Sequence, residues 1–194
     1  FRSIADGCSN HCTYCMIPHL RGPYRSRTVE DILEEASLLA AEGVKEINLI
    51  AQDTTAFGWD RKKEGELISL LESLDTLKGV RWIRLLYVYP DRVTPLLLRT
   101  MAQAKKIVPY LDIPFQHCAP RILKAMRREG SQVDAERLID EMRRYIPNLA
   151  LRTSLMVGFP GESAEDFRRL LQFVEEIQFD HVGVFAFSPE AGTR

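Results

Sequence analysis

The chain has 194 residues, of which 45% are hydrophobic and 27% are charged, and its formal net charge is −1. This composition is typical of a soluble globular protein, and the length is sufficient for one sizeable core. The near-zero net charge gives no indication of a polybasic tail for nucleic acid or for a membrane surface. No apolar run approaches the roughly 18 residues that a membrane helix requires, and no signal-peptide pattern is present.

The first half of the chain alternates predicted strands with predicted helices. Residues 2–6 form the first expected strand, which runs into Gly7. Thr28 and Asp31 have the spacing of a capping box, so we expect a helix to follow them and to end at Gly43. Further elements follow in order: a strand over 46–51, a helix with Leu67, Leu70, Leu71 and Leu74 on one face, a strand over 82–87, a helix opened by Thr94 and Pro95, and a strand over 110–113.

The second half continues this alternation, and Ser163 with Asp166 repeats the capping-box spacing before its last helix. Six strand–helix alternations with short links predict parallel strands and right-handed crossovers. We therefore expect an α/β fold, a partial (β/α)6 TIM-like barrel, with a doubly wound sheet as the main alternative. Either fold gathers its chemistry at the carboxyl ends of the strands. The elements expected in the second half are helical stretches around 122–126 and 138–145, a strand over 150–157, the capped helix with Phe167, Leu170, Leu171 and Val174, and a strand over 181–187.

Three of the four cysteines, Cys8, Cys12 and Cys15, lie in one loop directly after the first predicted strand, in the order Cys-x-x-x-Cys-x-x-Cys. Such a cluster fits a metal site better than a disulfide framework. Three thiolates can hold three irons of a four-iron cluster and leave the fourth iron open for a substrate or a cofactor. Zinc is the alternative, because a nearby histidine or Cys118 could complete the four ligands that it prefers. Ligand softness and spacing favour the iron–sulfur interpretation.

Two further candidates lie at the same predicted edge. Tyr14, directly before the third cysteine, could stack on an adenine or could simply fill a gap in the loop. Gln52 and Asp53 follow the second main strand and could hold an ammonium or a hydroxyl group of a small molecule. Locally, a polar turn in which Asp53 caps the next segment is the favoured interpretation.

Polar residues also follow the later strands, where a barrel builds its active site. Gln116 and His117 follow the strand over 110–113, and Arg152 lies in the strand over 150–157. Taken singly, each such residue is more often structural, and His117 could serve a core hydrogen bond or a function equally well. Val157 and Gly158 begin a glycine-containing loop that could bring backbone close to a ligand or could be a simple turn.

The remaining arginines and the fourth cysteine have simpler interpretations. The loop over 21–27 holds three arginines, which could bind a carboxylate or a phosphate or could form a solvated surface. Arg127 and Arg128 are predicted to lie on an exposed helix face, and Cys118 is predicted to be a small buried filler.

Together these motifs resemble the radical S-adenosylmethionine (SAM) superfamily, in which Cys-x-x-x-Cys-x-aromatic-Cys follows the first strand of a β/α repeat. Within it, residues 7–15, 21–22, 25–27, 157–162 and 188–193 resemble the methylthiotransferases, and the resemblance covers essentially the whole chain. One branch of that family modifies an adenosine of transfer RNA. The RimO branch modifies an aspartate of a small-subunit ribosomal protein, and the stretches that look like this branch are 51–55, 84–87, 89–91 and 110–117.

The resemblance implies a set of cofactors and of residues that bind them. It implies that Cys8, Cys12 and Cys15 hold a 4Fe–4S cluster, that SAM chelates the open iron, and that one electron cleaves SAM to a 5′-deoxyadenosyl radical. The protein then positions and shields reactive groups that the cofactors supply. By position, the implied SAM contacts are Tyr14 and the backbone of Val157 and Gly158 near the adenine, Gln52 and Asp53 near the methionine end, and Gln116 and Arg152 at the ribose or the carboxylate.

The resemblance also bears on domain organisation. The family carries a second 4Fe–4S cluster, held by three cysteines of an N-terminal domain, and a C-terminal accessory domain that resembles nucleic-acid-binding folds. Only Cys118 remains here outside the loop. We therefore expect residues 1–194 to be the radical SAM core domain of a longer protein, a fragment that binds one cluster and cleaves SAM but does not insert sulfur.

The expected function is that of a transferase core, for the methylthiolation of an aspartate on a small-subunit ribosomal protein. The implied partners are that ribosomal protein and an electron donor such as flavodoxin or ferredoxin, in the cytoplasm, with no membrane and no strong nucleic-acid signal. Two alternatives remain open. One is the core of a transfer-RNA adenosine methylthiotransferase, and the other is a non-catalytic module that holds structural zinc or an electron-transfer cluster.

Overall fold

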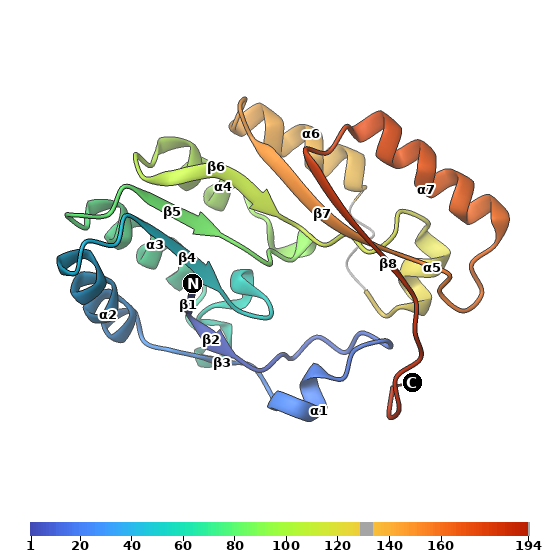
Figure 1. Cartoon of the computed structure of the whole chain (residues 1–194), viewed down its shortest axis with the longest axis horizontal. Coiled ribbons are helices and arrows are strands. Elements are labelled where there is room, and N and C mark those ends of the chain that lie inside the picture. The colour runs from blue at the N-terminus through green and yellow to red at the C-terminus, as the bar shows by residue number, and fades with distance from the viewer. Residues whose placement is uncertain (129–133, 194) are drawn as a thin grey trace.

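The structure is a computed structural model that describes residues 1–128 and 134–193. A curved parallel sheet forms its centre, and helices lie along the outer side of the curve (Figure 1). Its strands are β1 (Arg2–Ser3), β4 (Glu46–Ile50), β5 (Trp82–Leu85), β6 (Ile107–Asp112), β7 (Ala150–Val157) and β8 (His181–Ala186). In the described residues these six strands are ordered β1-β4-β5-β6-β7-β8, and every neighbouring pair is parallel. The sheet therefore has the strand order and direction predicted for a partial barrel.

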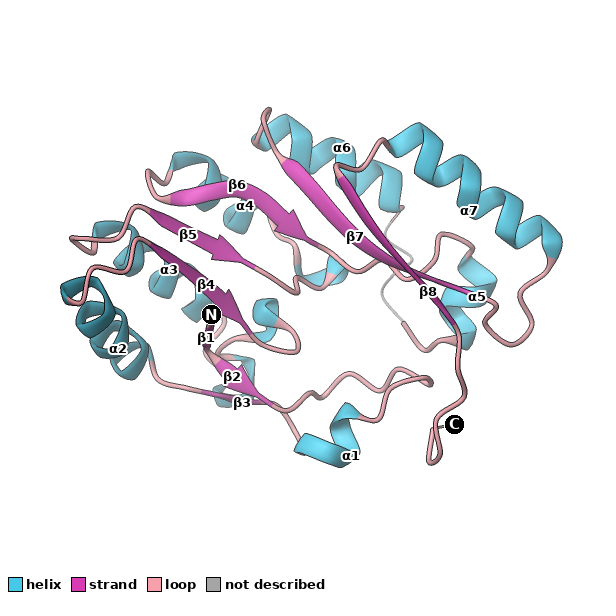
Figure 2. Ribbon diagram, viewed as in Figure 1, coloured by secondary structure: helices cyan, strands magenta, loops and turns pink. Residues whose placement is uncertain are grey.

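The helices alternate with the strands along the chain, as Figure 2 shows. The α-helices are α1 (Ile17–Arg21), α2 (Val29–Ala41), α3 (Glu66–Thr76), α4 (Pro95–Gln103), α5 (Pro120–Ala125), α6 (Ala135–Tyr145) and α7 (Ala164–Ile177). Short 3-10 helices η1 (Thr54–Ala56), η2 (Trp59–Arg61) and η3 (Pro90–Arg92) lie in the connections after β4 and β5. None of the helices within the described ranges combines the length and the apolar character needed to cross a membrane.

Side-chain caps fix the starts of α2, α4 and α7. The Thr28 hydroxyl accepts a hydrogen bond from the Asp31 backbone N–H at the start of α2, and Thr94 caps α4 in the same way. At α7 the capping box is complete, because Ser163 and Asp166 each accept from the other's backbone N–H. These bonds hold the pKa of Asp166 down at about 2, first through the Ser163 side chain.

The core lies between the sheet and the helices. Leu67, Leu70, Leu71 and Leu74 of α3 follow the helical repeat and are all buried, as the sequence predicts. They pack in one cluster with strand residues such as Leu85. Burying a leucine side chain contributes roughly 1.5–3 kcal/mol relative to leaving it exposed, so this face of α3 holds the helix on the sheet.

The first predicted strand is wrong in one respect, because residues 2–6 form two short strands. β1 pairs in parallel with β4, whereas β2 (Ala5–Asp6) pairs antiparallel with β3 (Arg25–Ser26). Ile4, between them, is fully buried. The chain therefore leaves the main sheet after Ser3 and starts a separate ribbon, which leads directly into the cysteine loop.

Strands β4 and β8 each end one residue earlier than predicted, and β5 and β6 differ more from their predicted bounds. β5 ends at Leu85, and Tyr87 has a positive φ of 58°, which is not a strand conformation. β6 begins at Ile107, although Pro109 lies inside it and proline is rare in central strands. An irregularity in the β5–β6 register accommodates that proline.

The buried face of α7 also differs from the prediction. Phe167 and Leu171 are 41% and 49% exposed, whereas Leu170, Phe173 and Ile177 are buried. The Phe173 ring packs against Phe115 and Phe179, with ring centroids 6.1 Å and 5.6 Å apart. This aromatic cluster rotates the helix so that Phe173, rather than Phe167 or Leu171, faces the core.

The burial of α3 gives a test of the core. We expect Leu71→Ala to lower the free energy of unfolding by about 2–5 kcal/mol, because the side chain is 0% exposed and its removal leaves a cavity. Leu38→Ala on α2 is the control, since Leu38 is 63% exposed, and it should change stability by less than about 0.5 kcal/mol. Urea denaturation of the two variants and the parent chain measures the difference. Equal losses in both variants would contradict this packing.

Candidate functional site

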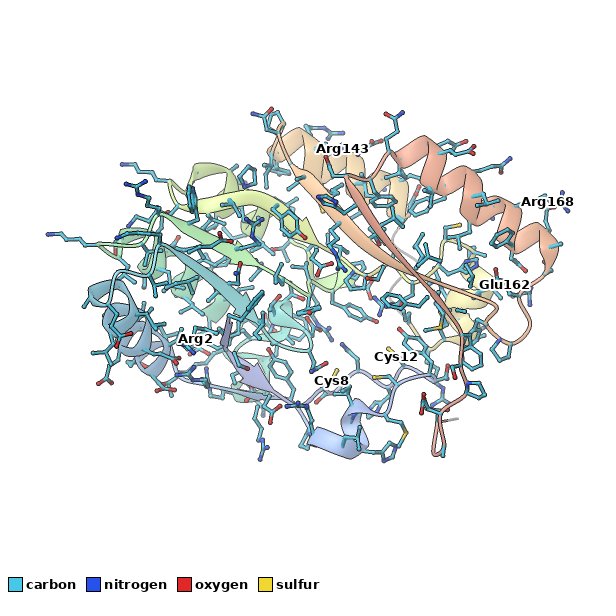
Figure 3. All side chains as sticks on the ribbon, viewed as in Figure 1. Arg2, Cys8, Cys12, Arg143, Glu162 and Arg168 are labelled. Carbon is cyan, nitrogen blue, oxygen red and sulfur yellow. The ribbon has the colours of Figure 1, made fainter. Side chains whose placement is uncertain are left out.

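The cysteine loop begins at the turn that follows β2. Gly7 there has a φ of +72°, and a Cβ atom on it would lie 2.2 Å from the Pro23 carbonyl oxygen. The Cys8 backbone N–H donates to the Gly22 carbonyl oxygen at 3.1 Å. The residue before the first cysteine is therefore restricted to glycine, because the backbone of Gly22 and Pro23 passes directly against it. Figure 3 shows Cys8 and Cys12 on this loop, which runs below the open side of the sheet.

A partly buried hydrogen-bond network fixes one side of the loop. The Asn10 amide donates to the Asp53 carboxylate at 3.0 Å and accepts from the Arg92 guanidinium at 3.1 Å. Arg92 also donates directly to Asp53, which is 1% exposed. The Arg92 guanidinium lies over the rings of Trp59 and Tyr89, at 5.0 Å and 4.9 Å from their centroids. The network joins the loop to the end of β4 and to η3.

Asp53 also makes bonds within its own turn. Its carboxylate accepts from the backbone N–H and the hydroxyl of Thr55, and so caps η1. This arrangement agrees with the local interpretation of Asp53 as the cap of a polar turn. The carboxylate is engaged by Asn10, Thr55 and Arg92 together, so its observed task is to hold the loop in place.

The end of α5 fixes the other side of the loop. The Thr13 backbone N–H donates to the Met126 carbonyl oxygen, and its hydroxyl donates to the Ala125 carbonyl oxygen, both at 3.1 Å. These are carbonyl groups at the end of a helix, which need partners from outside the helix. Tyr14 packs against a small apolar cluster that includes Ile122 and Phe159. The loop is thus tied to β4 on one side and to α5 on the other.

Between these two attachments lies a cavity of about 160 Å³ at the carboxyl ends of the strands. Its lining includes all three loop cysteines, and burial raises the pKa of the Cys8 and Cys15 thiols. The described residues that line it are Cys8, Asn10, Cys12, Tyr14, Cys15, Ile17, Gln52, Tyr87, Val88, Tyr89, Pro114, Gln116 and Arg128. The structure therefore gathers the cysteines with Tyr14, Gln52 and Gln116 around one cavity.

A second cavity, of about 430 Å³, is also lined by the three cysteines. His11 and His19 line it, together with Gly192 and Thr193 from the far end of the chain. Figure 1 shows this last segment descending from β8 toward α1. Within the described residues, all three cysteines together therefore line both of these cavities.

The four other candidates do not line the 160 Å³ cavity in the described structure. Asp53 lies in the network described above. Arg152, on β7, donates to the Asp112 carboxylate at 2.8 Å. The Val157 carbonyl oxygen accepts from Phe187 N–H at 2.8 Å, and the Gly158 N–H donates to the Glu162 carboxylate.

His117 serves the fold around this loop. It is 0% exposed, and its Nδ1 accepts from the backbone N–H groups of Cys118 and Ala119 at 3.0 Å and 2.9 Å. Its Nε2 lies 3.7 Å from a Glu162 oxygen. Burial lowers the pKa of His117. The imidazole therefore fixes the backbone of the two residues that precede α5, one of which is the partly buried Cys118.

Arg128 is the main residue that the sequence interpretation placed wrongly. It was predicted to be exposed with Arg127, but it is 6% exposed and lines the cavity. Arg127 has a φ of +50°, which turns the chain after α5 and directs the next side chain inward. Asn10 and Arg92 were also missed. The position of Asn10 between Cys8 and Cys12 is the one feature of the sequence that could have indicated its role in the site.

The donor set fits an iron–sulfur cluster. Across residues 1–128 and 134–193, no three His, Cys, Asp or Glu side chains are gathered closely enough to hold a single metal ion. The zinc interpretation therefore has no preformed site in that part of the chain. In a cluster each thiolate binds a different iron, so the three sulfur atoms need to share a cavity rather than a point. Cys8, Cys12 and Cys15 meet that requirement.

The network around Asp53 gives a second test. We expect Arg92→Met to lower the free energy of unfolding by about 3 kcal/mol, because it leaves a buried carboxylate without its cation. Arg168→Met is the control, since its pair with Glu165 is exposed and contributes less than about 0.5 kcal/mol. Adding Asp53→Asn to Arg92→Met should recover part of the loss. Urea denaturation measures all four proteins, and a loss no larger than that of the control would refute the role of the network.

Comparison with known proteins identifies the superfamily to which the chain belongs. The family model of the Radical SAM superfamily matches residues 3–174. Ribosomal protein uS12 methylthiotransferase RimO of Syntrophobacter fumaroxidans is 62% identical over 98% of this chain and 43% of its own length, and the RimO of Pelotomaculum thermopropionicum is 51% identical over 100% and 44%. The chain thus spans less than half the length of these curated relatives.

Among solved structures, the radical SAM methyltransferase TsrM of Kitasatospora setae superimposes with a TM-score of 0.76 at 18% identity, over 95% of this chain and 36% of TsrM. At that identity the likeness shows the fold alone, and it agrees with the parallel partial barrel. With a family match that runs from the first strand into α7, the chain belongs to the radical SAM superfamily.

Proposed function

We propose that this chain is the radical-generating core of a methylthiotransferase that modifies ribosomal protein uS12. The observation that carries the proposal is the cavity in which three cysteines, Tyr14, Gln52 and Gln116 meet at the carboxyl ends of parallel strands. The 62% identity to a RimO over nearly the whole chain supports the choice of substrate. Relatives that are 62%, 51% and 49% identical are each named ribosomal protein uS12 methylthiotransferase RimO, which favours uS12 over an adenosine substrate.

The cofactors follow from the superfamily. Cys8, Cys12 and Cys15 would each bind one iron of a 4Fe–4S cluster, and the fourth iron would take SAM. Once bound, the cluster and SAM supply one-electron reductive chemistry that yields a carbon radical. The chain's own residues bind, orient and shield these groups.

The proposed SAM site begins in the cavity and extends beyond it. Ligands of this size occupy pockets of about 300–1,000 Å³, so SAM cannot be confined to 160 Å³. We propose that Tyr14, Gln52 and Gln116 contact it within the cavity. Its remaining contacts would come from Arg152, Val157 and Gly158, along and after β7. Asp53 would contribute by holding the cysteine loop through its hydrogen bond with Asn10.

The division of labour in the whole protein is also part of the proposal. The chain covers 43% of the length of its relative from S. fumaroxidans, so uS12 recognition and sulfur insertion would draw on the remaining length. We propose that residues 1–194 are a radical SAM core domain, and that a second cluster in an N-terminal domain supplies sulfur. A flavodoxin or a ferredoxin in the cytoplasm would supply the electron.

The cysteines give the first test of this function. After anaerobic reconstitution with iron and sulfide, the chain should absorb visible light as a 4Fe–4S protein and convert SAM to 5′-deoxyadenosine under reducing conditions. Cys8→Ala, Cys12→Ala and Cys15→Ala should each lose the cluster and the product, because one iron loses its ligand. Cys118→Ala is the matched control and should retain both. A colourless protein with stoichiometric zinc would instead establish the metal-binding module, and a loaded core that forms no 5′-deoxyadenosine would exclude a radical enzyme.

The substrate is tested with the whole methylthiotransferase of which we propose that this chain is the core. Incubated with SAM, a reductant and either uS12 or transfer RNA, it should add one methylthio group to uS12 alone. Mass spectrometry of both substrates decides between them. Modification of the RNA and not of uS12 would show that the chain is the core of a transfer-RNA adenosine methylthiotransferase instead.

A further inference from the structure

Arg128 is a buried cation in the wall of the cysteine cavity. It is 6% exposed and follows directly after the turn that ends α5. Arginine stays protonated in proteins, so its charge is fixed. A buried charge is costly unless its surroundings stabilise it, and the contacts of this guanidinium therefore indicate what it does.

Three of those contacts join it to residues that line the cavity. Arg128 donates to the Pro114 carbonyl oxygen at 2.7 Å and to the Tyr14 hydroxyl at 3.4 Å. Its guanidinium also lies 4.5 Å from the centroid of the Tyr89 ring. Pro114, Tyr14 and Tyr89 line the cavity together with the cysteines. Arg128 therefore links the cysteine loop to the ends of β5 and β6.

The same end of α5 holds the backbone of the loop. Met126 and Ala125 accept from Thr13, and two residues later Arg128 reaches the side chain of Tyr14. Thr13 and Tyr14 stand between Cys12 and Cys15 in the sequence. The position of Arg128 relative to these two cysteines is thus set by three bonds.

We propose that Arg128 is a positioning residue that orients Tyr14 and holds a positive charge beside the cluster, and that this charge raises the reduction potential of the cluster. The inference rests on the proposed function, because it requires the cluster. Reduction adds a negative charge to a site that three thiolates already make anionic. A fixed cation stabilises that extra charge, and partial burial limits its screening by water.

The test is a redox titration of the reconstituted chain, followed by electron paramagnetic resonance. Arg128→Met removes the positive charge and keeps most of the length of the side chain. Arg128→Lys keeps the positive charge but replaces the planar guanidinium with an ammonium group. Arg127→Met is the matched control, because it removes the same charge from the adjacent exposed residue. Iron and sulfide content and circular dichroism are measured for every variant.

We expect Arg128→Met to lower the ratio of reduced to oxidised cluster at a given potential at least tenfold, which for one electron is a shift of about 59 mV. Arg128→Lys should stay within threefold of the parent, and Arg127→Met should not differ from it. A fully loaded Arg128→Met with the parent potential overturns the proposal. If Arg128→Met does not bind the cluster, the Arg128→Lys variant decides the question. A lysine variant that binds the cluster and has the parent potential supports a role for the positive charge. A lysine variant that does not fold or does not bind the cluster shows that Arg128 is only a structural residue.

Failure of this inference is distinguishable from failure of the proposed function. If the parent chain binds no cluster or forms no 5′-deoxyadenosine, the proposed function fails. If the parent chain does both and its potential does not respond to Arg128, only the inference fails.

Discussion

The site depends on one buried carboxylate. Asp53 at the end of β4 is almost fully removed from water, and a charge in such a place must be paired and hydrogen-bonded. Its partners come from two other parts of the chain, Asn10 in the cysteine loop and Arg92 in η3. Because the three groups satisfy one another, the loop has one stable position against the sheet. A loop without this partner would have to pay the ordering entropy of its residues from its own few contacts.

The second attachment, at Thr13, holds the other side of the loop, so that a cavity remains between the loop and the sheet. Asn10 and Thr13 are three residues apart, and Cys12 lies between them. The first is bound to β4 and η3, and the second is bound to α5. The loop therefore lies across the carboxyl ends of the strands, and the cavity between loop and sheet is where the proposed cofactors would bind.

Local sequence rules account for most of the scaffold. The strand over 150–157 and the capping box of Ser163 and Asp166 are predicted to the residue, because period-2 burial and cap chemistry are both properties of a few adjacent residues. The cysteine cavity with Tyr14, Gln52 and Gln116 follows from the rule that parallel strands bring their carboxyl ends together. What could not be predicted depends on distant partners. The ribbon of β2 and β3, the inward turn of Arg128 and the pairing of Arg92 with Asp53 each join segments more than 10 residues apart.

The turn at Gly7 has a consequence for how such chains can be found. With the Pro23 carbonyl oxygen 2.2 Å from where a Cβ would stand, any other residue would force the two passing segments apart. Steric exclusion thus adds a glycine in front of the cysteine pattern, and the Asn10 amide adds a second required position inside it. A search signature written on physical grounds would read Gly-Cys-x-Asn-x-Cys-x-aromatic-Cys. It would select chains whose loop can be seated on the sheet in this way, and not merely chains with three cysteines at the right intervals.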